Sequence, residues 1–123
     1  MTRKATGALG ERLAANFLNQ HGYRIIENNF RCREGEIDII AVKNDCLVFV
    51  EVRAKRSRLF GTPEESITAT KKKHLRAAAE RYRQAHNGLP TEWRIDVVAV
   101  ELDRSGKVQR LEIIENAVED EEG

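Results

Sequence analysis

The sequence reads GEIDIIAVKNDCLVFVEVRAK from Gly35 to Lys55, and this segment predicts two β-strands joined by a short polar turn. The two strands, Glu36–Val42 and Leu47–Ala54, are rich in isoleucine and valine, and the Lys43–Asp45 segment between them has turn composition. Apolar residues occupy both faces of each strand, which is typical of central strands that are covered on two sides. The segment therefore predicts the middle of a sheet with other elements packed on both faces.

Each of these apolar strands also contains a carboxylate, Asp38 in the first and Glu51 in the second. An unpaired charge inside a buried strand is costly, so two such residues in neighbouring strands indicate a shared site. Side chains alternate across a strand, and Glu51 therefore shares a face with Arg53 and Lys55. If the hairpin register places Asp38 opposite Glu51, the two carboxylates can bind Mg²⁺ or Mn²⁺. Such an ion activates a water for attack on phosphorus, which predicts hydrolysis of a phosphodiester.

The rest of the chain predicts two helices and three further strands. Thr62, Pro63 and Glu65 form a helix start, with a capping hydroxyl, a proline at the first helical position and a glutamate three residues after the cap. The helix that begins there extends to about His86, and an interruption near residues 68–70 stays open. The other predicted elements are a helix at residues 7–21 and strands at residues 23–31, 93–101 and 109–114.

This order of elements predicts a single α/β or α+β domain at residues 1–114, with a central mixed sheet of four to five strands flanked by helices. Residues 115–123 (ENAVEDEEG) are acidic and predict a flexible tail. The longest apolar run is far shorter than a membrane span, so no membrane partner is expected. The N-terminus lacks the apolar segment of a secretory signal, which favours a cytoplasmic location. Cys32 and Cys46 lack the spacing of a zinc site or a disulfide framework.

The net charge of +1 hides a strong asymmetry along the chain. The acidic tail holds five of the 20 acidic residues, which leaves 15 acidic against 21 basic residues in the body. Residues 53–83 contain ten Lys or Arg and three Glu, and a cluster of this kind can bind a phosphate backbone. Lysine-rich helix surfaces are also common in proteins that bind no nucleic acid, so both interpretations stay open. The candidates for nucleic-acid contact are Arg56, Arg58, Lys71, Lys72, Lys73 and Arg76.

Longer segments of the chain resemble a known family. The matching segments are GALGERLAANFL, GYRIIENNFRCREGEIDII, LVFVEVRAKRSRLFGTPEESIT and WRIDVVAV, between residues 7 and 100. They resemble the YraN family of small bacterial proteins, which is similar in turn to archaeal Holliday-junction resolvases. An acid on one strand followed by EVR on the next is also similar to the PD-(D/E)XK nuclease core. The resemblance implies a restriction-endonuclease-like three-layer α/β fold and an Mg²⁺-dependent endonuclease that acts on DNA.

The resemblance also implies roles for individual residues. Asp38 and Glu51 match the two acids of the nuclease motif, and the main-chain carbonyl of Val52 is implied as a further metal ligand. Glu11 matches the acidic residue that the first helix of resolvase-like nucleases points toward the metal, and an ordinary exposed charge is the alternative at this position. Branched or single-stranded DNA is the implied partner. A homodimer is implied as well, because a junction has two strands to cut.

Arg53 departs from the family pattern, because nucleases of this type usually have lysine at this position. A guanidinium cannot accept a proton at working pH, so Arg53 can bind the scissile phosphate or stabilise the transition state but cannot act as a base. Lys55, on the same strand face, could supply the lysine. The sequence therefore leaves three hypotheses open: a working nuclease, a module that has lost catalysis and only binds nucleic acid or protein, and a structural partner that uses its acidic tail as the contact.

Overall fold

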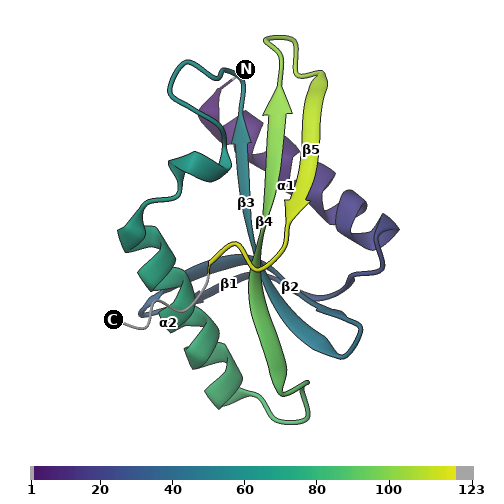
Figure 1. Ribbon diagram of the computed structural model, residues 1–123, viewed down its shortest axis with the longest axis vertical. Helices are drawn as coiled ribbons and strands as arrows, with labels where there is room; N and C mark the ends of the chain where they lie inside the picture. Colours follow the sequence, from purple (N-terminus) through teal and green to yellow (C-terminus); the bar gives the residue numbers. More distant parts are fainter. Residues whose placement is uncertain (1, 119–123) are drawn as a thin grey trace.

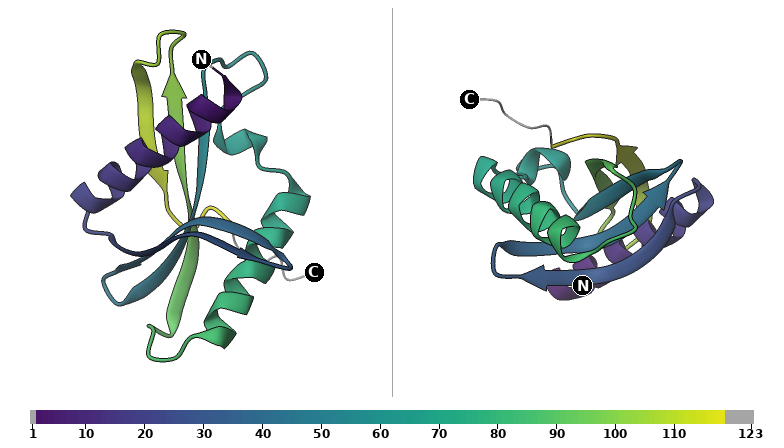
Figure 2. Two further views of the ribbon diagram at one scale, coloured as in Figure 1. Left: turned by 180° about the vertical axis from the view of Figure 1, so that it is seen from behind. Right: turned by 90° about the horizontal axis from the view of Figure 1, so that it is seen from below.

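The computed structural model describes residues 2–118 and contains a five-stranded sheet between two α-helices (Figure 1). The two α-helices lie on opposite faces of the sheet, as the front and back views in Figures 1 and 2 show. This arrangement confirms the predicted three-layer α/β fold. In chain order, the elements are α1 (Arg3–Gln20), β1 (Arg24–Cys32), β2 (Gly35–Lys43), β3 (Cys46–Lys55), the 3₁₀ helix η1 (Glu64–Ser66), α2 (Ala69–Ala85), β4 (Glu92–Leu102) and β5 (Val108–Ile114).

The strands lie in the sheet in the same order as in the chain. β3 and β4 pair in parallel and the other neighbours are antiparallel, which confirms the predicted mixed sheet. β2 pairs with β3 only as far as Ile39 opposite Val50, and beyond that point β3 continues with β4 alone up to Lys55. The β1–β2 hairpin therefore leaves the rest of the sheet at the position of Asp38 and Glu51, and Figure 1 shows the two parts diverging.

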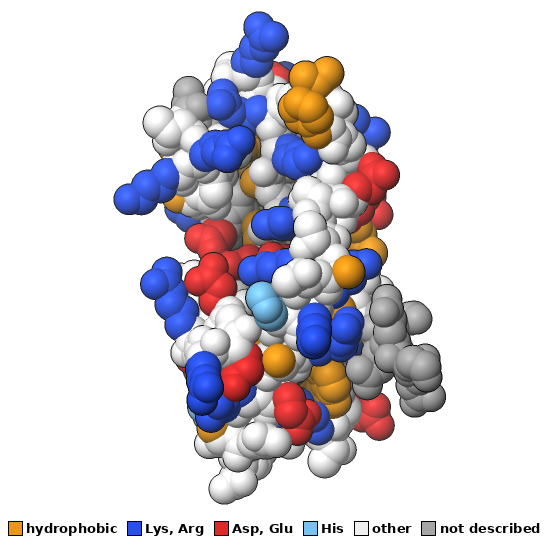
Figure 3. Space-filling view, turned by 90° about the vertical axis from the view of Figure 1, so that its left-hand side faces the viewer, with side chains coloured by type: hydrophobic (Ala, Val, Ile, Leu, Met, Phe, Trp, Pro, Cys, Tyr) orange, Lys and Arg blue, Asp and Glu red, His pale blue; other side chains and the backbone are white. Residues whose placement is uncertain are grey.

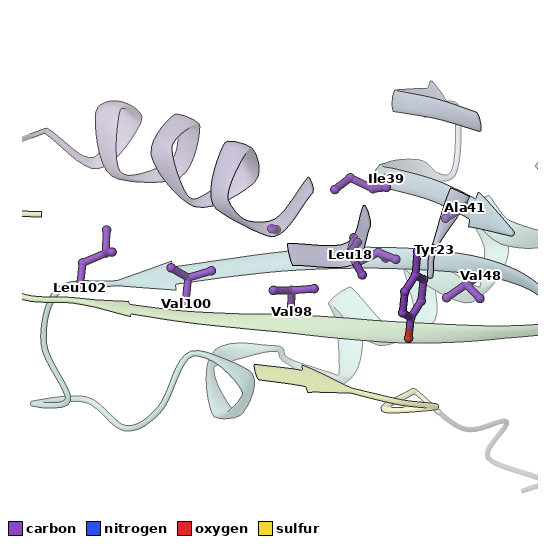
Figure 4. Close-up of a cluster of buried hydrophobic side chains, with 10 residues drawn as sticks. Leu18, Tyr23, Ile39, Ala41, Val48, Val98, Val100 and Leu102 are labelled. Atoms are coloured by element: carbon purple, nitrogen blue, oxygen red, sulfur yellow. The ribbon is translucent and has the colours of Figure 1, made fainter. Parts of the chain in front are cut away.

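One hydrophobic cluster fills the space between α1 and the sheet (Figure 4). Thr2 begins the helix, because its hydroxyl accepts the N–H of Ala5 at 3.0 Å. Gly10 brings α1 so close to β3 that a Cβ atom at this position would lie 2.6 Å from the Cβ of Ala54. The buried residues of the cluster are Ala14, Leu18, Tyr23, Ile39, Ala41, Val48, Val50, Val98, Val100 and Leu102.

A second cluster lies between α2 and the opposite face of the sheet. The helix predicted from residue 63 is interrupted, as the sequence allowed. Thr62 and Glu65 form the expected reciprocal cap, with Glu65 Oε1 accepting the N–H of Thr62 at 2.9 Å, but they close only the short turn η1. Thr68 then caps α2 by accepting the N–H of Lys71 at 3.1 Å. The buried residues are Ile37, Ile40, Leu47, Phe49, Leu75, Ala78, Ala79, Tyr82, Ile95 and Val118.

The segment after β5 packs on the same side of the sheet as α2. Ala117 donates its N–H to the carbonyl of Ile95 at 2.9 Å, and Val118 is buried. The packed chain therefore extends at least to Val118, past residue 115, where the tail was predicted to begin. The remainder of that predicted tail, residues 119–123, lies outside the described residues. Neither α-helix in the described chain is long and apolar enough to pass through a membrane.

Candidate functional site

The carboxylates of Asp38 and Glu51 lie where β2 and β3 separate. Ile39 lies opposite Val50, so Asp38 and Glu51 are the next residues along the two strands, which is the register that a shared site requires. Asp38 Oδ2 accepts a hydrogen bond from the main-chain N–H of Val52 at 2.8 Å. This hydrogen bond lies just beyond the last paired residues of β2 and β3, and it holds the Asp38 carboxylate beside β3.

Glu51 is almost completely buried, with 2% of its surface exposed. Burial raises the pKa of Glu51 well above the ordinary glutamate value, and the neighbouring Asp38 carboxylate raises it further. Two cations oppose this shift, because Lys71 Nζ lies 3.5 Å and Arg53 Nη1 3.8 Å from Glu51 Oε2. Lys71 and Arg53 therefore offset only part of the rise in the pKa of Glu51 that burial and Asp38 cause.

Glu11 brings a third acid to this place from α1. The residue is partly buried, and the pKa of its carboxyl is raised, first by burial and then by the carboxylate of Asp38. It is therefore not an ordinary exposed charge. Glu36 also raises the pKa of Glu11 but is itself exposed, and it pairs with Arg31 at 3.4 Å. We call Glu11, Asp38 and Glu51 the acid cluster.

The acid cluster is not a complete set of side-chain ligands. Within residues 2–118, no three His, Cys, Asp or Glu side chains are placed so that they could hold one ion together. What the cluster offers is two adjacent carboxylates on β2 and β3, a third on α1, and the main chain of β3 at Val52. The three carboxylates offer hard oxygen atoms, and Val52 is placed at the site by the N–H that it donates to Asp38.

Arg53 lies between the acid cluster and η1. Its Nη2 donates to the carbonyl of Ser66 at 3.2 Å, and its Nη1 faces Glu51. The Nε of Arg53 is buried and has no hydrogen-bond partner in the described part of the chain. A buried donor without a partner is rare in folded proteins. The guanidinium is thus a fixed cation that still has an unused donor.

A groove of about 590 Å³ lies between the first half of α1, the loop after β3, and the part of β3 that β2 leaves uncovered. Four cationic side chains line it: those of Arg3, Arg53, Lys55 and Arg56. Figure 3 shows the face on which the loop after β3 and the start of α2 lie. Acidic side chains gather at mid-height of this face, with Lys and Arg side chains above and below them.

The residues predicted to contact nucleic acid lie in different places. Arg56 lines the groove, and Lys71 reaches the acid cluster. Arg58 donates Nη2 to Glu101 Oε2 at 2.8 Å, although 62% of its side chain is exposed. The other three predicted contacts, Lys72, Lys73 and Arg76, lie along α2.

The sequence did not reveal that Lys71 lies beside Glu51 of the acid cluster or that Arg3 lines the groove. A signal for Lys71 was present, because it precedes Leu75 by four residues and so continues the buried stripe of α2. Arg3 has no comparable signal. It reaches the groove only because α1 crosses β3 at a particular angle.

Asp96 is fully buried as well, and its carboxylate is occupied by hydrogen bonds within the fold. It accepts hydrogen bonds from the Tyr23 hydroxyl at 2.8 Å, from Arg94 Nε at 2.9 Å and from the N–H of Asn116 at 2.9 Å. These contacts join the residue before β1, strand β4 and the C-terminal segment. The network fits a structural role for Asp96.

Fold and site together define a small three-layer α/β protein in which a cation-lined groove adjoins a cluster of one buried and two partly buried carboxylates. The chain belongs to the family described as "Uncharacterised protein family UPF0102", whose model matches residues 10–100. This agrees with the resemblance to the YraN family.

Bacterial relatives of this family match almost the whole chain. A UPF0102 protein of Dehalococcoides mccartyi is 50% identical over 119 residues, which cover 97% of this chain and 97% of that protein. UPF0102 proteins of Moorella thermoacetica and Symbiobacterium thermophilum are each 45% identical over 117 residues, which cover 95% of this chain and 98% of either protein.

Proposed function

We propose that the protein is a metal-dependent endonuclease that hydrolyses phosphodiester bonds of DNA. The observation that carries this proposal is the position of the acid cluster, where the buried Glu51 and two partly buried carboxylates adjoin a groove lined by four cations. Cations along a groove neutralise the phosphates of a bound strand. Carboxylates beside that strand would repel its phosphates, because both are negatively charged, unless a metal ion lies between them.

The donors of the acid cluster fit Mg²⁺ or Mn²⁺ better than a softer ion, because all of them are oxygen atoms. Asp38 and Glu51 would hold the ion, with Glu11 and the Val52 carbonyl as further donors. Mg²⁺ commonly uses one or two carboxylates and takes its other ligands from water and substrate phosphate, so three converging side chains are not required. When bound, the ion lowers the pKa of a water and polarises the phosphate. The raised pKa of Glu51 supports the fit, since a cation at this point would offset the buried charge.

The cations around the site have separate tasks in this proposal. Arg53 stays charged, and it holds a phosphate oxygen or stabilises the negative charge that develops in the transition state. Lys71, 3.5 Å from Glu51, provides the amine that position 53 lacks, and it orients the attacking water. Lys55 lines the groove and binds the strand. The cations of the site therefore come from β3 and from α2.

A cleavage assay tests the proposal. Purified protein is incubated with Mg²⁺ or Mn²⁺ and with duplex, single-stranded and four-way-junction DNA, beside Asp38→Asn and Glu51→Gln. Both substitutions keep a hydrogen-bond acceptor and remove a charge, so they should abolish cleavage while the protein stays folded. Glu36→Gln is the matched control, because Glu36 is an exposed glutamate two residues before Asp38 on β2 and should keep full activity. Equal cleavage by the wild type and Asp38→Asn on every substrate would contradict the proposal.

A second candidate function is a nucleic-acid-binding module that has lost catalysis. It is favoured by Arg53, which stands where a catalytic lysine is expected and already pairs with Glu51. In that case the wild type binds DNA with an affinity that falls steeply as salt is added, Lys72→Glu with Lys73→Glu weakens binding, and no metal produces cleavage. Cleavage that disappears in Asp38→Asn would exclude this candidate.

A further inference from the structure

The loop between β3 and η1 exposes two large apolar side chains to solvent. Leu59 is 79% exposed and Phe60 is 85% exposed, whereas Val108 on β5, the third exposed large hydrophobic residue within residues 2–118, is 39% exposed. Leu59 and Phe60 occupy the two central positions of a tight turn, because the N–H of Gly61 donates to the carbonyl of Arg58 at 2.9 Å. Gly, Pro, Asn, Asp and Ser usually take such positions. Folding gains nothing from the two apolar side chains, so packing does not explain them.

The turn is anchored to the sheet at its base. Arg58 forms two hydrogen bonds to Glu101, a residue of β4 that is 8% exposed. The N–H of Leu59 donates to Ser57 Oγ at 3.1 Å. Gly61 has a φ of 93°, in the region that favours glycine, so the turn closes without strain. A tip that is already ordered loses little conformational freedom when it binds a ligand.

The tip also borders the groove beside the acid cluster. Phe60 lines the groove together with Arg3, Lys55 and Arg56. The front view (Figure 1) and the back view (Figure 2, left) both show the loop beside the start of α1. An aromatic ring among cations binds single-stranded nucleic acid well, because cations contact the phosphates and the ring stacks on a base. An apolar protein surface carries no negative charge to match the four cations that line the groove, so the charge of the groove favours a polyanion.

We propose that Leu59 and Phe60 form a stacking site for an unpaired base of a DNA strand that lies in the groove. The inference deepens the proposed function and rests on it in one respect, since the same strand continues to the acid cluster. Bases inside an intact duplex are already stacked on each other, so the tip could stack on one of them only after separating it from its neighbour, which costs free energy. The site therefore directs the protein to DNA with unpaired nucleotides, such as single strands, flaps and branch points.

Binding in the absence of divalent metal tests this site apart from catalysis. The probes are a fluorescein-labelled single strand and a blunt duplex of the same length, titrated with the full chain in EDTA at low ionic strength. Phe60→Ala should weaken single-strand binding about five- to hundredfold, the usual range for one stacked base, while Phe60→Trp keeps it. Val108→Ala is the matched control, because it removes an exposed apolar side chain from β5, and it should change neither affinity.

Tryptophan fluorescence gives an independent readout. Phe60→Trp and Val108→Trp each add one exposed indole to a chain whose own Trp93 is partly buried. Stacking on a base quenches an indole, so the single strand should quench Phe60→Trp clearly more than Val108→Trp. Equal quenching of the two variants would speak against contact between position 60 and a base.

Three results would overturn the stacking site. The first is equal single-strand affinity of the wild type and Phe60→Ala, or an equal loss on single strand and duplex. The second is a wild type that does not bind the single strand at low ionic strength. The third is a change in oligomeric state in Phe60→Ala without any change in DNA binding, which would assign the tip to a second copy of the chain. A selective loss in Phe60→Ala together with a wild type that never cleaves would support the stacking site and contradict the endonuclease.

Discussion

Arg53 is the residue on which the proposed catalysis at the acid cluster most depends. Its guanidinium is held by the Ser66 carbonyl and faces Glu51, so it is well placed to bind an anion. It cannot take a proton from water. Lys71 is the amine that the fold brings to the same carboxylate, from an element that follows β3 by a loop and η1. The roles proposed for Arg53 and Lys71 can be tested with single substitutions.

Arg53→Lys should raise the rate of DNA cleavage with Mg²⁺ by about tenfold or more, because a lysine at this position can orient and deprotonate the attacking water. The substitution removes the bond to Ser66, which should lower the free energy of unfolding by about 1 kcal/mol. Initial rates on the preferred substrate measure the first effect, and urea denaturation measures the second. A rate that stays at the wild-type level would show that position 53 does not limit catalysis.

Glu51→Gln should stabilise the metal-free protein at neutral pH by about 1 kcal/mol while it abolishes cleavage. The pKa of Glu51 is raised, so the folded state of the wild type disfavours the charge that the unfolded chain carries without cost. Stability of the wild type therefore falls as pH rises above the ordinary glutamate value, and an amide escapes this loss. Thermal denaturation in EDTA is the measurement, with Glu36→Gln as the exposed control. A lower melting temperature in Glu51→Gln than in the wild type would contradict the account.

Helix α1 positions one acid of the cluster through a close approach to β3. Gly10 lies against Ala54, and the next residue of the helix is Glu11. A side chain at position 10 would push the helix away from the strand and take Glu11 with it. The packing of α1 is thus coupled directly to the composition of the site.

Gly10→Ala should lower the free energy of unfolding by about 1–3 kcal/mol, because its Cβ would overlap Ala54. Gly7→Ala is the matched control in the same helix. A Cβ there has no heavy atom within 4 Å, so the higher helix propensity of alanine should stabilise the protein by up to about 1 kcal/mol. Urea denaturation of both variants measures the difference. Effects of the same sign and size would show that α1 does not rest on Ala54.

The sequence predicted the elements well, because their signals are local. Alternating and continuous apolar runs located all five strands, and the mixed sheet followed from their order. The carboxylates Asp38 and Glu51 were conspicuous because the residues around them are apolar. Even the break after Glu65 was marked, since Thr68 offers a second capping hydroxyl.

Features that depend on the angle between elements could not be predicted. The exposure of Leu59 and Phe60 on a tight turn has no local signal in the sequence, because large apolar side chains are usually buried. The divergence of β2 from β3 opens the groove, yet no residue encodes it locally. Lys71 and Glu51 are brought together only when Leu75, Ala78 and the rest of the buried stripe place α2 on the sheet.

On the scale of the whole molecule, one network of ion pairs joins η1, β4, β5 and the turn after β3. Arg110 on β5 donates to Glu64 at 2.6 Å and to Glu101 at 3.0 Å, and Glu101 also binds Arg58. Hydrogen bonds from Arg110 lower the pKa of Glu64 to about 2. Hydrogen bonds from Arg58 and then from Arg110 lower the pKa of Glu101 as well. Ion pairs therefore hold the β5 edge of the sheet to η1 and to the turn that borders the groove.

Arg110→Met should lower the free energy of unfolding by about 1–3 kcal/mol at neutral pH, because Glu64 loses its arginine and Glu101 keeps only Arg58. A carboxylate whose folded pKa is depressed adds stability that is fully present above its unfolded value and is lost as pH falls. The difference in free energy of unfolding between wild type and variant should therefore shrink as the pH falls from 4.5 to about 2. These are the pKa values of Glu64 in the unfolded and in the folded chain. Denaturation curves at several pH values give the result. A gap that stays constant over this window would rule out the ion pairs as its source.

Because β3 pairs with β4, the candidate site can be completed during synthesis only after β4 has been made. Glu11, Asp38 and Glu51 leave the ribosome early, but the half of β3 beyond Val50 has no neighbouring strand until β4 has been made. Parallel neighbours need a long crossover, and here that crossover is the segment that contains α2 and supplies Lys71. A nascent or truncated chain that ends before Glu92 would carry Glu51 on an unsupported strand, so the proposed binding and cleavage should appear only after β4, in the last quarter of the chain, has been made.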